Sequence, residues 1–357
     1  MSVTRERVLE ALSVVQDPDL HRDLVALGMI EDVVIDGGRV GFTVALTTPA
    51  CPVKDDLERQ CREAVAALPG VTSVAVTMTS KVRGRVNPAA DKQPIPGVAH
   101  VVAVGSGKGG VGKSTVAVNL AAALALDGAR VGLLDADVYG PNLPLMAGIR
   151  ETPLQRDGKI LPLHAHGMAL MSMGFLVEPG TPVIWRGPML HGVIQNFTRD
   201  VAWGELDYLL VDLPPGTGDV QLSLVQQVPL AGAVIVCTPQ AVALEDAVKA
   251  IAMFEKLDVP VLGLIENMSY FVCPNCDARH EIFAHGGARA YADERGIPFL
   301  GEVPLHAGVR EGGDRGAPIV RSAPNAPEAA AFRAAARRLA ARLSIQAAAA
   351  PAPATTS

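Results

Sequence analysis

The sequence predicts an α/β protein, in which a mostly parallel sheet with helices on both faces follows a small α+β domain. Residues 98–345 alternate short apolar runs with helical stretches, which favours a parallel sheet covered by helices. A glycine-rich loop joins the first of these runs to a strong helix former. The 49% apolar content with only 4% aromatic residues is typical of an Ala/Val/Leu-rich α/β protein.

The first domain is expected over residues 1–82, and residues 83–97, rich in proline, are expected to be a linker. A break at Asp17-Pro18 separates the first helix from a hairpin turned by Asp36-Gly37-Gly38. The expected elements are a helix at Arg5–Gln16, strands at Met29–Ile35 and Arg39–Leu46, a helix at Pro52–Leu68 and a strand at Val71–Thr79.

The second domain is expected over residues 98–345, with a low-complexity, disordered tail at 346–357. The predicted strands are Val101–Val104, Arg130–Leu134, Met168–Met173, Tyr208–Val211, Gly232–Cys237, Val261–Ile265 and Phe299–Val303.

Charge and hydropathy exclude several classes of function. The net charge of −6 gives no reason to expect a nucleic-acid partner. The polar N-terminus lacks a signal-peptide core, and no apolar run reaches the roughly 18 residues of a membrane span. Five cysteines are an odd, sparse count that argues against a disulfide framework. These observations predict a cytoplasmic protein without a membrane partner.

Residues 107–114, Gly-Lys-Gly-Gly-Val-Gly-Lys-Ser, fit G-x-x-x-x-G-K-S/T, the loop of P-loop NTPases. Its backbone N–H groups and the following helix N-terminus favour phosphates. Lys113 is expected to reach the β- and γ-phosphates. The second lysine, Lys108, makes sense if it reaches the nucleotide of another subunit, so the loop also indicates a homodimer. The expected nucleotide-binding residues here are Gly107, Lys108, Gly109, Gly110, Val111, Gly112, Lys113, Ser114 and Thr115.

Acidic residues follow two of the apolar strands, where ligands collect in open α/β sheets. Asp212 is the candidate holder of Mg²⁺, with the Ser114 hydroxyl as a direct ligand. Asp137 is expected to orient the attacking water, because phosphoryl transfer needs positioning more than covalent help. The backbone N–H of Gly216 is placed to sense the γ-phosphate. The alternative for either aspartate is a helix cap or a turn.

Cys273-Pro-Asn-Cys276 follows the strand ending at Ile265 and is expected in an irregular stretch. Two thiolates are half a coordination sphere, and the same pair from a second chain completes the set for a 4Fe–4S cluster. Zinc bound with His280 and His285, a redox dithiol and a plain surface loop are the alternatives. Cys51 precedes a helix and is either a reactive thiol or a buried structural one.

Three motifs together resemble the deviant-Walker ATPases: Lys-Gly-Gly-x-Gly-Lys-Ser/Thr, Asp-Ala-Asp-x-Tyr-Gly-Pro and Asp-Leu-Pro-Pro-Gly-Thr-Gly-Asp. Within that MinD/ParA-like group they are most similar to the Mrp/ApbC-type iron–sulfur cluster carriers. Residues 1–82, with Asp17-Pro18 and Thr-Thr-Pro-Ala-Cys-Pro at 47–52, resemble the MIP18-like domain often fused in front of these ATPases.

The resemblance implies ATP rather than GTP and a CxxC that bridges a cluster between subunits. It makes Lys108 the signature lysine, Asp137 the switch I residue and Asp212 the Walker B residue. It also implies that Asn267, in Glu-Asn-Met-Ser, reads the adenine.

The leading hypothesis is an ATP-binding, slowly ATP-hydrolysing carrier of a labile 4Fe–4S cluster, which it passes to apo-proteins from a homodimer interface. One alternative is a MinD/ParA-like spatial-organisation ATPase, in which the basic helix Glu328–Ile345 would lie on a membrane rather than pack on the ATPase domain. The other is a zinc-binding, nucleotide-dependent metallochaperone. The segment Trp185–Met189 is either a partner contact or a structural turn.

Overall fold

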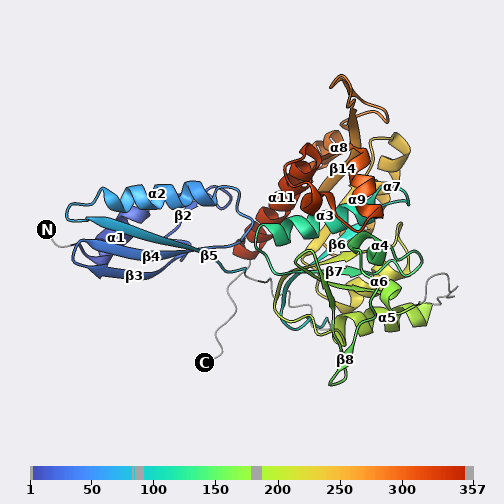
Figure 1. Cartoon of the computed structure of the whole chain (residues 1–357), viewed down its shortest axis with the longest axis horizontal. Coiled ribbons are helices and arrows are strands. Elements are labelled where there is room, and N and C mark those ends of the chain that lie inside the picture. Colours follow the sequence, from blue (N-terminus) through green and yellow to red (C-terminus); the bar gives the residue numbers. More distant parts are fainter. Residues whose placement is uncertain (1–2, 83, 85–91, 178–186, 350–357) are drawn as a thin grey trace. The chain divides into compact units, whose positions relative to one another are not determined.

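The computed structural model describes residues 3–82, 84, 92–177 and 187–349. Contacts within the chain divide it into two compact units, of which the larger spans Gly84–Leu339 (Figure 1). The smaller contains the N-terminal residues and the last part of the C-terminal helix.

The small unit is built on the sheet β3-β4-β5. Its strands are β3 (Ile30–Asp36), β4 (Arg39–Leu46) and β5 (Ser73–Ser80). Helix α2 (Lys54–Ala66) makes the crossover that the parallel pair β4–β5 requires. Helix α1 (Arg5–Leu12) is capped by the Thr4 hydroxyl and ends earlier than expected, since Gln16–Asp17 pairs as β1 with β2 (Arg22–Asp23).

Among the described residues of the large unit, nine strands form one sheet in the order β10-β11-β7-β12-β6-β13-β14-β15, with β16 beside β14. The pairs among β11, β7, β12, β6, β13, β14 and β16 are parallel, whereas β10 and β15 pair antiparallel at the edges. The bounds are β6 (Val98–Gly105), β7 (Val131–Asp135), β10 (Leu163–Ala165), β11 (Met168–Ser172), β12 (Leu206–Asp212), β13 (Gly232–Cys237), β14 (Val261–Val272), β15 (Arg279–His280) and β16 (Phe299–Leu305). The predicted fold class is confirmed.

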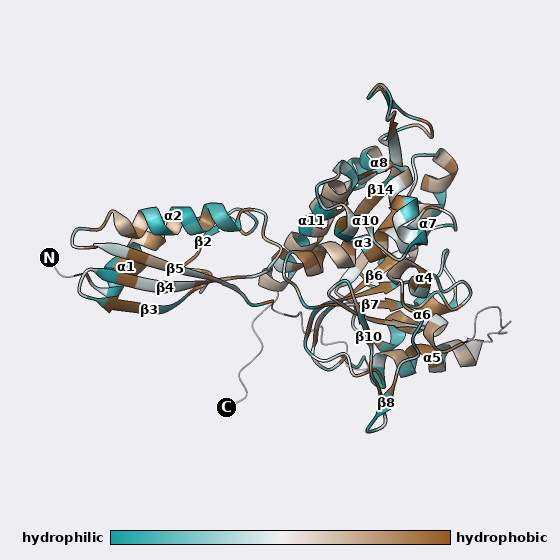
Figure 2. Ribbon diagram, viewed as in Figure 1, coloured by the Kyte–Doolittle hydropathy of each residue, from teal (hydrophilic) through white to brown (hydrophobic). Residues whose placement is uncertain are grey.

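The central strands are mostly hydrophobic (Figure 2) and largely buried, because both faces of the sheet are covered. Val101 and Ala103 share a core cluster with residues of α5, α6 and α7. The alternating Val102 and Val104 are equally buried and face the opposite side, where α3 contacts the sheet.

The helices of the large unit connect the strands, and one short hairpin lies beside them. The helices are α3 (Lys113–Leu126), α4 (Leu143–Ala147), α5 (Gly187–Arg199), α6 (Asp219–Gln227), α7 (Ala241–Lys256), α8 (Gly287–Arg295), α9 (Ala307–Asp314), α10 (Ile319–Ser322) and α11 (Pro327–Ala349), with a 3₁₀ turn η1 (Met173–Phe175). The hairpin pairs β8 (Gln155–Arg156) with β9 (Lys159–Ile160).

Two expectations about the chain need correction. Strand β14 does not end at Ile265 but continues to Val272, so the cysteine motif lies in a hairpin turn rather than an irregular stretch. A disordered tail was expected from residue 346 on, but helix α11 continues through residues 346–349. It continues because this segment is rich in alanine, the best helix former. The rest of that tail and most of the segment 83–91 lie outside the described residues, as do Trp185 and Arg186.

Helix α11 packs on the large unit through its apolar face. Phe332 and Leu339 are fully buried, and the guanidinium groups of Arg333 and Arg337 pair with Asp127 at the end of α3, at 3.4 and 2.7 Å. The basic residues that a membrane-surface helix would direct toward lipid thus bind a carboxylate of the protein. In the part of the chain that the structure describes, no helix combines the length and apolarity needed to cross a bilayer.

Candidate nucleotide site and cysteine hairpin

The glycine-rich loop leaves the end of β6 and enters α3 at Lys113. Gly112, the N-cap, has φ +79°, and a Cβ there would collide with the Asn267 side chain. A Cβ on Gly107 would collide with the backbone at Asp246. These two positions therefore require glycine for reasons that the sequence motif alone does not show.

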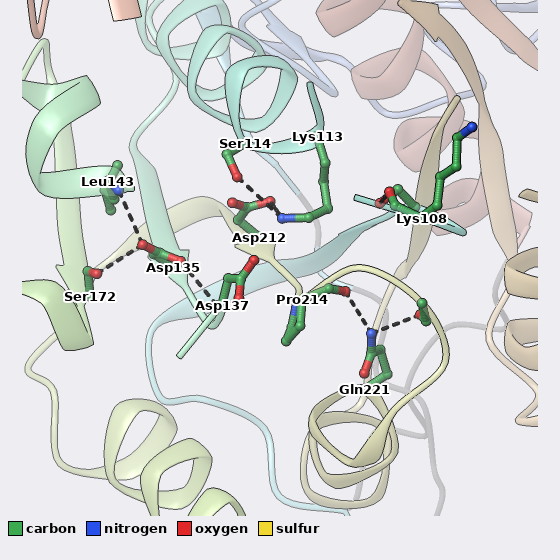
Figure 3. A network of polar contacts seen from close by, with 12 residues as sticks. Lys108, Lys113, Ser114, Asp135, Asp137, Leu143, Ser172, Asp212, Pro214 and Gln221 are labelled. Carbon is green, nitrogen blue, oxygen red and sulfur yellow. Dashed lines mark hydrogen bonds and ion pairs between the residues drawn. The ribbon is translucent and has the colours of Figure 1, made fainter. Parts of the chain in front are cut away.

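Three of the predicted site residues come together at the start of α3. The Lys113 Nζ lies 2.6 Å from Oδ1 of Asp212, and both side chains are 6% exposed (Figure 3). The same ammonium group donates to the Ser114 hydroxyl at 3.3 Å. A buried ion pair of this kind is stable only because both charges are present, so removing either leaves an uncompensated charge.

Asp135, at the end of β7, organises the loop that carries Asp137. One of its carboxylate oxygens accepts from the Asp137 N–H at 3.1 Å. The other accepts from the Leu143 N–H at 3.2 Å, at the start of α4, and from the Ser172 hydroxyl at 2.9 Å. Burial, together with the nearby negative charge of Asp212, raises the pKa of Asp135 to about 7.

Sequence reasoning assigned a role only to Asp137 and missed Asp135, although both acids stand in the same Asp-Ala-Asp motif. The spacing of Asp135 and Asp137 was the signal that could have identified Asp135. Residues two apart in an extended strand share a face, so both carboxylates could be expected on the same side. The pKa of Asp137, which is only partly buried, is raised chiefly by burial.

The loop after Asp212 lies against the glycine-rich loop. The Gly216 N–H, predicted to sense the γ-phosphate, donates to the Ser106 carbonyl at 2.9 Å. Gly216 has φ +87°, in the region that favours glycine. In this structure the predicted sensor is thus bonded to the residue that precedes the glycine-rich loop.

A pocket of about 430 Å³ extends from the glycine-rich loop to a wall made by the end of β16 and by α9. Asn267 stands between the two regions, and its Nδ2 donates to the Val111 carbonyl at 2.8 Å. Figure 3 shows the Lys108 side chain directed away from the Lys113–Asp212 pair. The predicted residues that line the pocket are Lys108, Gly109, Gly110, Gly112, Lys113, Ser114, Thr115, Asp137 and Asn267.

The remaining predicted residues, Gly107, Val111, Asp212 and Gly216, are not among the lining residues. Two of them contact lining residues directly, since Asp212 pairs with Lys113 and the Val111 carbonyl accepts from Asn267.

The cysteine hairpin joins β14 to β15. The Cys273 N–H donates to the Ala278 carbonyl and the Cys273 carbonyl accepts from the Asp277 N–H, both at 2.9 Å. Pro274, Asn275 and Cys276 form the turn of this hairpin. The Asn275 N–H, the Cys276 thiol and the Cys276 N–H lower the pKa of the Cys273 thiol, in that order. Because Cys276 is exposed and Cys273 partly exposed, both sulfurs are accessible to a metal centre.

His285 is occupied by groups other than the cysteines. Its Nε2 lies 2.6 Å from a Glu302 oxygen and 2.7 Å from the Arg279 guanidinium, and its Nδ1 lies 3.6 Å from Glu281. His280 is exposed in β15, opposite Phe271. A zinc site that combines the cysteines with His285 would have to break these contacts.

Glu266 braces the base of the hairpin. It is fully buried and accepts from the Ser269 hydroxyl at 2.6 Å and from the N–H groups of Gly286 and Ala288 at 3.0 and 2.9 Å. It thereby anchors the N-terminus of α8 to β14. Ligand atoms of Glu266, His285 and Glu302 lie within 4.8 Å of one another, but these hydrogen bonds already account for the Glu266 carboxylate.

The other cysteines differ from the CxxC pair in their surroundings. Burial raises the pKa of the Cys61 thiol to about 11, and burial with the Glu266 charge raises that of Cys237 to about 12. Both are protonated core side chains at neutral pH. Cys51 is partly buried and packs at the edge of the small unit's core.

Comparison with known protein families gives two matches. Residues 97–340 match a family described as NUBPL iron-transfer P-loop NTPase, and residues 5–77 match one described as iron–sulfur cluster assembly protein. Apart from Ala340, the first matched region falls in the large unit, and the second falls in the small unit.

Individual relatives cover nearly the whole chain. An iron–sulfur cluster carrier protein of Deinococcus radiodurans is 54% identical over 96% of both chains, and one of Escherichia coli is 40% identical over 95% of this chain and 92% of its own. Among solved structures, a nucleotide-binding protein of Archaeoglobus fulgidus in complex with ADP is 39% identical, covers 68% of this chain and 96% of its own, and superposes with a TM-score of 0.57. The MinD cell division ATPase of Pyrococcus furiosus, 23% identical over 67% of this chain and 97% of its own with a TM-score of 0.52, shares the fold.

Proposed function

Because the chain belongs to the family of NUBPL iron-transfer P-loop NTPases, we propose that it is an ATP-hydrolysing carrier that binds a labile 4Fe–4S cluster at a homodimer interface and delivers it to apo-proteins. The observation that carries this proposal is the course of β14. The strand brings Asn267 against the glycine-rich loop and presents Cys273 directly after its last residue. One element thus joins the nucleotide pocket to the pair of accessible thiols.

The nucleotide chemistry follows from the residues at the start of α3. ATP rather than GTP is favoured as the nucleotide, because the Archaeoglobus relative was solved in complex with ADP. The Ser114 hydroxyl and the Asp212 carboxylate both lie within hydrogen-bond distance of the Lys113 ammonium group. These hard oxygen ligands, close to one another, fit Mg²⁺. The metal would neutralise charge that develops on the phosphates.

The protein's own groups then do the positioning. Lys113 leaves Asp212 for the β- and γ-phosphates, and Asp137, held through its N–H by Asp135, orients the attacking water. Lys108 is directed away from this site and is free to reach the nucleotide of the second subunit.

The cluster is the cargo. Cys273 and Cys276 supply two thiolates, and the same pair from a second copy completes the four that a 4Fe–4S cluster takes. The lowered pKa of Cys273 favours the thiolate that binds iron. Because Asn267 and Cys273 lie on one continuous segment, a change of nucleotide sensed at Asn267 would reach the cysteines, which is how hydrolysis would loosen the cluster.

The test is anaerobic reconstitution with ferrous iron and sulfide, followed by metal and sulfide analysis. About four irons per dimer are expected in the wild type. The Cys273→Ala/Cys276→Ala variant should hold none, whereas the matched control Cys237→Ala, in the core, should hold the full amount. Iron retained by the double variant would contradict the proposal that Cys273 and Cys276 bind the cluster.

The zinc-binding alternative is separated by a His280→Ala/His285→Ala variant in the same assay. Retention of iron and of the chromophore by this variant supports the cysteine-only site. Loss of metal would favour a metallochaperone whose histidines are ligands.

A further inference from the structure

Gln221 lies in the first turn of α6 and is 2% exposed. Its Nε2 donates to the carbonyl of Pro214 at 2.7 Å and to that of Gly216 at 2.9 Å (Figure 3). Both N–H donors of the amide are therefore used on the loop that follows Asp212. A glutamine at this helix position commonly bonds to the N-cap N–H. Here it ties down the loop instead.

The two carbonyls belong to the peptides on either side of the Pro215–Gly216 peptide. The N–H of that middle peptide is the one bonded to Ser106. By holding both neighbours, Gln221 fixes the direction in which the Gly216 N–H points. A glycine with φ +87° has no side chain to restrain it, so this restraint comes from outside the loop.

The Oε1 of Gln221 accepts no hydrogen bond from the residues that the structure describes, although it is buried. The reverse amide orientation would set this oxygen against two carbonyl oxygens, so the orientation is fixed by chemistry. Gln221 lines a pocket of about 350 Å³ together with Asp137 and Gly218.

We propose that Gln221 is a positioning residue for ATP hydrolysis, which rests on the function proposed above. It acts through the loop and does not touch the phosphate. Its amide keeps the Gly216 N–H in a single orientation. This N–H can therefore exchange its acceptor, from the Ser106 carbonyl to a γ-phosphate oxygen, without the peptide sampling other orientations. The pocket beside Asp137 holds the water that attacks.

The test compares steady-state ATPase kinetics of Gln221→Met and Gln221→Glu with the wild type. Methionine keeps the length and loses both donors, so kcat should fall about 10- to 100-fold while KM changes little. Protonated glutamate regains one O–H donor, so the activity of Gln221→Glu relative to wild type should rise as the pH falls. The Gln227→Met control, on the same helix, should match the wild type.

Circular dichroism and nucleotide binding of each variant accompany the kinetics. Unchanged kcat in Gln221→Met, or equal losses in both variants at every pH, would overturn the positioning role. A wild type that binds ATP without hydrolysing it would refute the ATPase function itself, which is a different outcome. Cluster content at Cys273 and Cys276 should stay at the wild-type value in all variants.

Discussion

At the scale of single residues, the site depends on buried carboxylates whose partners are backbone N–H groups. Asp135 fixes the start of α4 and the Asp137 peptide, while Glu266 fixes the start of α8. The sequence predicted most of the residues that line the pocket beside the glycine-rich loop, because P-loop chemistry repeats a short motif. It did not predict these two anchors, because their bonds join segments far apart in the chain or depend on the path of a loop.

Asp135 should make stability depend on pH. Its pKa is raised from 3.8 to about 7, so the folded state binds more protons than the unfolded state between these values. Its contribution to the free energy of unfolding is therefore present at low pH and is lost as the pH rises toward 7.

The Asp135→Asn variant stays neutral and should lose this dependence. Urea denaturation from about pH 5 to about pH 8 should show the variant gaining stability relative to the wild type as the pH rises. A difference that stays constant across this range would contradict the raised pKa.

At the scale of elements, β14 shows where sequence reasoning stops. The apolar run ends at Ile265, and the polar residues after it indicated a loop. The structure buries Glu266, Asn267 and Ser269 because each finds a hydrogen-bond partner from another segment or within the bend. Met268 takes φ +54°, and the register with β16 shifts between Asn267 and Phe271. Such a bent, polar strand has no periodic pattern to predict it.

The brace at Glu266 should be sensitive to its charge. In Glu266→Gln an amide N–H₂ replaces one acceptor oxygen and faces a backbone N–H donor, so the free energy of unfolding should fall by about 1–3 kcal/mol. Chemical denaturation measures this change. The control Glu281→Gln, at a largely exposed side chain, should have a negligible effect. Equal stabilities of the two variants would show that Glu266 is not an anchor.

At the scale of the whole molecule, the sequence predicted two functional units, and the family matches fall in each of them. The homodimer stays a prediction that Lys108 and the half-complete thiol set support independently. Neither the sequence nor the structure of a single chain shows the dimer interface, because a site shared between two copies is incomplete in either one.

Lys108→Ala should weaken ATP-dependent dimerisation by about tenfold or more, since two symmetry-related charge-assisted contacts to phosphate, one from each subunit, are lost. Sedimentation velocity with a non-hydrolysable ATP analogue measures the dimer fraction. Lys256→Ala, an exposed lysine at the end of α7, is the matched control. Dimers of equal strength in both variants would exclude the trans contact.

Cluster transfer tests the proposed carrier function most directly. Reconstituted protein is mixed anaerobically with an apo-enzyme that needs a 4Fe–4S cluster, and the recovered enzyme activity is followed with and without Mg-ATP. Recovery is expected with the wild type at a rate that depends on nucleotide, and none is expected with Cys273→Ala/Cys276→Ala. Recovery that is equal for the wild type and the double variant, as free iron and sulfide alone would give, would contradict the proposed carrier function.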